Sequence, residues 1–92
     1  MSLNETMKAL ADDERREILE HLRERPMSAG EIAANFDLSN ATVSYHLKVL
    51  KKAGLITENR EKNYIIYSLS ASVFEDVLAW FYKIGGKKED DE

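Results

Sequence analysis

The stretch SNATVSYHLKVLKKAGL, residues 39–55, combines two kinds of side chain along one helical repeat. Val43, Leu47 and Leu50 recur at the three- and four-residue spacing of a buried helical stripe. With about 100° between successive residues, the small, polar and basic side chains fall on the far side of the helix. These far-side residues are Ala41, Ser44, Tyr45, Lys48 and Lys52. The pattern predicts a helix with one side packed in a core and the other turned toward a polar partner.

A second short helix is expected immediately before this one. Ser28 and Glu31 form an S-x-x-E capping box that opens a helix reaching Phe36. Residues 37–39 make a tight connection, and the last of them is a serine suited to cap the next helix. Two short helices joined by a three-residue turn predict a helix-turn-helix, whose second helix can enter the major groove of DNA.

Two strand-like segments, residues 55–60 and 64–69, follow around a polar turn. Arg60 and Lys62 lie at the tip of this hairpin, where a wing can meet the DNA backbone. Small side chains on the helix allow close approach to bases, hydroxyl and amide groups offer hydrogen bonds, and lysines can meet phosphates. The candidate DNA-binding residues are Ser39, Asn40, Ala41, Thr42, Ser44, Tyr45, Lys48, Lys52, Arg60 and Lys62.

The charge distribution supports this interpretation, although the chain as a whole has a formal net charge of −4. Residues 40–69 hold five cations and two acids, a local net charge of +3. Charge alone leaves two interpretations open, a nucleic-acid footprint or ordinary surface scatter. Taken alone, the pattern of residues 39–55 is equally consistent with a helix that packs one face in the core and exposes the other to solvent without binding a partner. The basic hairpin that follows the helix favours DNA binding.

Several segments of the chain resemble the ArsR family of bacterial winged helix-turn-helix repressors. The run SNATVSYHLKVLKKAGLI, followed by a basic turn and YIIYSL, carries the similarity, with S-x-H-L-x-x-L-x-x-A-G-L as its most specific part. The opening MKALADDERREILEHL is similar to the family's entry pattern, with Asp13-Glu14 where Pro-Thr is common. The resemblance implies a repressor that binds a double-stranded DNA operator. The cysteine-free chain and its aromatic last helix are most similar to the metal-independent, SdpR-like autorepressors.

The sequence offers few residues suited to a metal site, a cofactor site or a catalytic site. The chain has no cysteine, which removes thiolate ligands. Its last helix offers Glu75 and Asp76 but no histidine, and His46 is expected to pack, hydrogen-bonded, on the core side of its helix. Ser44 and His46 are two residues apart, so they do not face each other on a helix. We expect no metal site, no cofactor and no catalytic residue; an unidentified protein or small-molecule effector remains open. The alternative function is a winged helix that binds protein instead of DNA.

The last helix, from Ser70 to Ile84, predicts a subunit interface. Its apolar residues span an arc of about 160°, wider than the roughly 100° stripe that one core requires. The expected interface residues are Leu3, Met7, Phe74, Val77, Trp80, Phe81 and Ile84. The alternative is that Trp80 covers only its own domain. The family resemblance implies the same pairing of first and last helices, and a two-fold dimer would match a palindromic operator.

The expected fold class is mainly α with a small β-hairpin wing (α+β), a winged helix-turn-helix in the order ααααββα. Residues 1–84 are expected to form one DNA-binding and dimerisation domain, and residues 85–92 a flexible charged tail. No apolar run approaches the roughly 20 residues of a membrane span, and the N-terminus does not resemble a secretory signal. A cytoplasmic protein without membrane insertion is expected.

Overall fold

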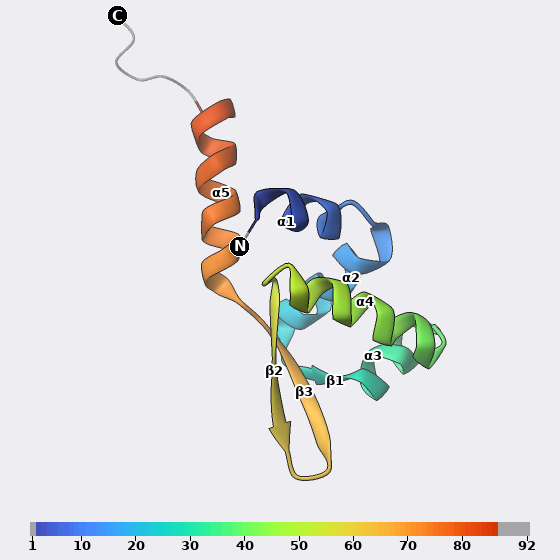
Figure 1. Ribbon diagram of the computed structural model, residues 1–92. Coiled ribbons are helices and arrows are strands. Elements are labelled where there is room, and N and C mark those ends of the chain that lie inside the picture. Colours follow the sequence, from blue (N-terminus) through green and yellow to red (C-terminus); the bar gives the residue numbers. More distant parts are fainter. Residues whose placement is uncertain (1, 87–92) are drawn as a thin grey trace, which may run out of the picture.

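The computed structural model describes residues 2–86 and shows a winged helix-turn-helix with helices gathered beside a β-hairpin (Figure 1). The hairpin and the last helix project from opposite ends of this body. The elements are α1 (Leu3–Leu10), α2 (Asp13–Glu24), β1 (Met27–Ser28), α3 (Ala29–Phe36), α4 (Asn40–Lys52), β2 (Ile56–Glu61), β3 (Tyr64–Leu69) and α5 (Ala71–Gly85). The expected α+β class is confirmed.

Side-chain hydrogen bonds cap the starts of α2 and α3, and the cap of α3 is the capping box that the sequence predicts. The Asp12 carboxylate accepts a hydrogen bond from the Arg15 backbone N–H at 3.0 Å and so caps α2. Ser28 and Glu31 complete their capping box at the start of α3. Ser70 stands at the N-cap of α5, but its side chain makes no capping hydrogen bond within residues 2–86.

The sheet has three strands, not the two that were expected. It is antiparallel in the order β1-β3-β2, with Met27 opposite Tyr67 and Ser28 opposite Ile66. A two-residue strand is too short to show alternation in sequence, and its extended form is stabilised by pairing with β3 and by burial of Met27. β2 runs one residue later than expected, and Lys62 in the hairpin turn adopts a positive φ of 53°.

The core lies between the four N-terminal helices and the base of the hairpin. Its largest fully buried side chains include Ile18, Ile32, Val43, Leu50 and Leu55. Each is expected to contribute about 1.5–3 kcal/mol through removal of apolar surface from water. Burial of these side chains holds α4 with a fixed face toward the core and a fixed face toward solvent.

The described part of the chain ends at Gly86 and so covers only the first two residues of the expected tail. Gly85 is the last residue of α5, whereas residues 87–92 of the expected charged tail lie outside the described part of the chain. The domain boundary at residue 84 therefore stays a prediction.

Within residues 2–86, none of the helices combines the length and apolar character needed to span a membrane.

Candidate nucleic-acid interface

Helix α4 presents the outward face that its sequence predicts. Val43, Leu47 and Leu50 are buried, whereas the side chains expected to face DNA are exposed. Asn40, Ala41, Ser44, Tyr45, Lys48 and Lys52 form this exposed set, and Tyr45 is 59 % exposed. An exposed aromatic ring has no role in the core, so this side of α4 is available to a partner.

Two of the expected DNA-binding side chains serve the start of α4. The Ser39 hydroxyl accepts the Thr42 backbone N–H at 3.1 Å and donates to the Thr42 hydroxyl at 3.0 Å. Thr42 is half-buried. These bonds fix the direction in which α4 leaves the turn, while the helix N-terminus keeps its partial positive charge. The structure thus indicates a structural role for both hydroxyls.

The hairpin carries Arg60 and Lys62 as exposed cations, and it also carries an acid toward α4. Glu58 of β2 lies 3.2 Å from the Lys51 ammonium at the end of α4. Burial raises the pKa of the neighbouring Tyr67 hydroxyl, and the Glu58 carboxylate raises it further. These groups border a hollow of about 200 Å³ between α4 and the hairpin. The sequence analysis missed the position of Glu58, because only the packing of β2 against α4 brings it to this surface.

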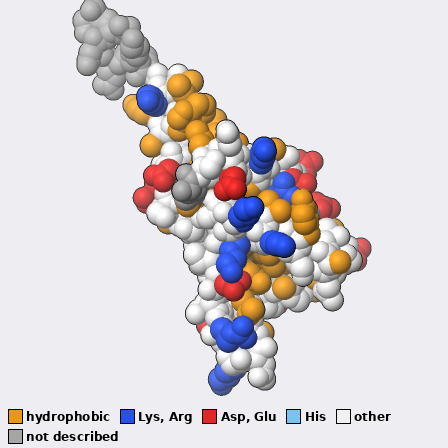
Figure 2. All heavy atoms as spheres, viewed as in Figure 1, with side chains coloured by type: hydrophobic (Ala, Val, Ile, Leu, Met, Phe, Trp, Pro, Cys, Tyr) orange, Lys and Arg blue, Asp and Glu red, His pale blue; other side chains and the backbone are white. Residues whose placement is uncertain are grey.

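Lysine and arginine side chains follow one another in a band from α1, across α4, to the tip of the hairpin (Figure 2). The band crosses a chain that is acidic overall. Cations collected along one face provide sequence-independent attraction to a phosphate backbone.

A buried histidine connects α4 to the helices behind it. His46 is 5 % exposed, and its Nε2 lies 2.8 Å from a Glu14 carboxylate oxygen of α2. Its Nδ1 lies 3.4 Å from the Arg15 guanidinium, which also donates to the Ala9 carbonyl at 2.8 Å. A guanidinium only donates, so Nδ1 is the acceptor and Nε2–H the donor to Glu14. The expected packed, hydrogen-bonded role of His46 is confirmed, and the network joins α1, α2 and α4.

Three side chains in the same region could in principle act together as metal ligands, and they are the one such group among the described residues. Ligand atoms of Asp12, Glu14 and His46 all lie within 4.8 Å of one another. The Arg15 guanidinium lies 4.0 Å from the Asp12 carboxylate and also contacts His46. The Arg15 backbone N–H lowers the pKa of Asp12. A fixed positive charge at this point opposes a divalent cation, so the cluster is better described as a hydrogen-bond network centred on Arg15.

The expected subunit interface is only partly available at the surface. Val77 is 7 % exposed and belongs to the core of its own chain, and Phe74 and Met7 are half-buried. The expectation for Val77 is revised accordingly, because the first turns of α5 pack on the domain. The large apolar side chains exposed on α1 and α5 are Leu3, Leu78, Trp80, Phe81, Tyr82 and Ile84.

Comparison with known proteins identifies the family. Residues 10–59 match a family model described as a helix-turn-helix domain. Transcriptional repressor SdpR of Bacillus subtilis (strain 168) is 37 % identical over 89 residues, which cover 97 % of this chain and 99 % of that protein. The structure also matches an ArsR-like transcriptional regulator from Rhodococcus sp. RHA1, with a TM-score of 0.83, 26 % identity and coverage of 90 % of this chain and 78 % of the other. The chain belongs to the ArsR family of winged helix-turn-helix transcriptional regulators.

Another solved relative of this ArsR-family chain is described as a homodimer. It is the winged helix-turn-helix DNA-binding domain of Mb0332 from Mycobacterium bovis, a possible ArsR-family regulator. Its TM-score is 0.74 at 27 % identity, and the match covers 87 % of this chain and 80 % of that one. Proteins of this family are transcriptional regulators and not enzymes, as expected for the present chain.

Proposed function

We propose that this ArsR-family protein is a repressor that binds a palindromic double-stranded DNA operator as a homodimer and regulates its own gene. The observation that carries the proposal is the outward face of α4, where Ser44, Tyr45 and Lys48 are exposed and the band of cations continues into the wing (Figure 2). The related SdpR is itself named a transcriptional repressor.

The N-terminal half of α4 would lie in the major groove. Small side chains at Ala41 and Ser44 let the helix approach base edges, and Tyr45 offers a hydroxyl from the same face. Lys48 and Lys52 would contact phosphates on either side of the groove. Arg60 on the wing would follow the adjacent backbone, which orients the domain without reading sequence.

A dimer accounts for the apolar end of α5 and for a palindromic site. Trp80 and Ile84 extend the helical stripe begun by the buried Val73 and Val77, but they lie beyond the domain core and are exposed. Pairing of these stripes would bury them and place two recognition helices about 34 Å apart, one turn of DNA. The homodimeric state of Mb0332 supports this assembly.

Repression would require neither a metal ion nor another cofactor. The sequence has no cysteine, and His46 is already engaged by Glu14 and Arg15. Release of the operator by an unidentified protein or small-molecule effector, or simple autorepression without an effector, would both be compatible with these features.

Fluorescence anisotropy with duplex DNA from upstream of the protein's own gene tests the proposal. Affinity should exceed that for an unrelated duplex of equal length and fall steeply with salt, because phosphate contacts release counterions. Ser44→Ala should lower operator affinity about fivefold, the effect of one lost hydrogen bond. The matched control is Ser72→Ala, which changes an exposed serine on α5. Absence of salt-dependent binding would instead favour the protein-binding alternative.

A further inference from the structure

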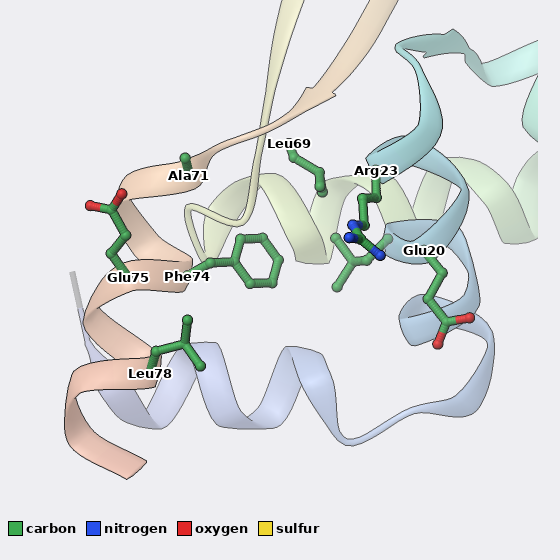
Figure 3. Close-up of a pocket in the computed structure, with 8 residues that line it drawn as sticks. Glu20, Arg23, Leu69, Ala71, Phe74, Glu75 and Leu78 are labelled. Carbon is green, nitrogen blue, oxygen red and sulfur yellow. The ribbon is translucent and has the colours of Figure 1, made fainter. Parts of the chain in front are cut away.

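An apolar groove of about 450 Å³ lies between α2, the end of β3 and the start of α5 (Figure 3). Leu19, Leu69, Phe74 and Leu78 provide its apolar surface. Its volume falls within the roughly 300–1,000 Å³ of small-molecule sites. The groove lies away from the outward face of α4, so DNA contact does not account for it.

The charged groups of the groove are arranged unequally. Figure 3 shows the Arg23 guanidinium reaching from α2 toward the space that Leu69 and Phe74 enter. The carboxylates of Glu20 and Glu75 point away from this apolar centre. Among residues 2–86, Arg23 has no acidic group within ion-pair distance, unlike Arg15, Arg16 and Arg25. The inner edge of the groove therefore combines apolar surface with one guanidinium that forms no ion pair among the described residues, while two carboxylates of the lining point away from it.

We propose that this groove binds a small, free amphiphilic carboxylate. Its apolar chain would lie against Leu69, Phe74 and Leu78, and its carboxylate would accept hydrogen bonds from the Arg23 guanidinium. A planar guanidinium matches a carboxylate with two parallel N–H···O bonds. A ligand with a cationic head would be repelled by Arg23. A neutral hydroxyl head would accept a hydrogen bond from the guanidinium but would not neutralise its charge.

The groove borders the expected dimer interface and shares Phe74 with it, but Leu78 lies on another side of α5 from the exposed stripe proposed to pair. Successive helical residues are about 100° apart, which turns Leu78 away from the stripe of Val77, Trp80 and Ile84. A bound ligand would join α2 to α5 within one protomer. If the proposed DNA-binding dimer is correct, such a bridge would influence how α5 holds the two recognition helices.

Three eight-carbon probes that differ only in their head group test the site: octanoate, octanol and octylamine. Each is titrated into DNA-free protein and followed by heteronuclear NMR, so the result does not depend on operator binding. Octanoate should bind most tightly and shift the resonances of Leu69, Phe74 and Leu78. Equal or tighter binding of octylamine, shifts confined to other surfaces, or no saturable binding by octanoate would overturn the proposal.

Charge variants test the assigned partner of the carboxylate. Arg23→Gln should weaken octanoate about threefold to tenfold and remove its advantage over octanol, because a charge-assisted hydrogen bond is lost. Arg25→Gln removes the same charge two residues away, outside the groove lining, and should change octanoate binding little. Glu20→Gln should strengthen it. Equal losses in the Arg23 and Arg25 variants would refute the assigned contact in favour of general electrostatic attraction.

Discussion

Replacing Trp80 and Ile84 together by serine is expected to convert the proposed dimer into a folded monomer. Both side chains lie on the helical stripe of Val73 and Val77, but beyond the part of α5 that packs on its own domain. Their exposed surface gives the size of the effect.

Trp80 is 39 % exposed and Ile84 is 64 % exposed in the single chain. A large aromatic side chain buries up to about 250 Å², so roughly 100 Å² of Trp80 remains for an interface. At about 25 cal/mol per Å² this surface contributes about 2.5 kcal/mol, and Ile84 adds about 1.5 kcal/mol. Two protomers contribute, but ordering and desolvation offset about half of the total. The dimer Kd should therefore rise about a thousandfold.

Sedimentation velocity over a dilution series measures this change, and circular dichroism checks the fold. The matched control is Leu78→Ser with Tyr82→Ser, which has the same four-residue spacing on another side of α5. Both control residues are 67 % exposed, a larger exposed fraction than that of Trp80 or Ile84, so the control also removes a large amount of exposed side-chain surface. The dimer should survive the control. Dissociation in the control, or an intact dimer in the Trp80 and Ile84 variant, would refute the assigned interface.

Three further predictions concern charge. Glu58→Gln removes the acid paired with Lys51 and should raise affinity for a random duplex about twofold to fivefold in anisotropy at fixed salt, because an opposing charge is lost. Asp12→Asn keeps an acceptor at the α2 cap but no longer titrates. The Arg15 backbone N–H lowers the folded-state pKa of Asp12 below its unfolded value. The parent protein should therefore lose this stabilisation as pH falls from about 5 through the folded pKa. The Asp12→Asn variant should lose less stability over the same pH range, in acid unfolding followed by circular dichroism. Stoichiometric zinc should leave operator affinity unchanged, since His46 is already engaged; a saturable zinc-dependent shift in affinity would contradict metal independence.

Short-range patterns in the sequence determined most of the helical organisation. Cap positions such as Asp12 and Ser39 depend on the next three residues, and the stripe of Val43, Leu47 and Leu50 repeats within two turns. Such features follow from local hydrogen bonding and helical periodicity, so one segment contains all the information required. The outward face of α4 was predictable for the same reason.

Packing between distant segments decided the rest. β1 exists only because residues 27–28 meet β3 about forty residues later, and Glu58 reaches the surface proposed to face DNA only because β2 lies beside α4. The sequence marked Val77 as apolar, but whether it is covered by its own chain or by a partner depends on where α5 rests. The direction of Arg23 into an apolar groove likewise requires α2, β3 and α5 to come together. These contacts join residues that no helical or strand repeat relates, so only the tertiary structure could determine them.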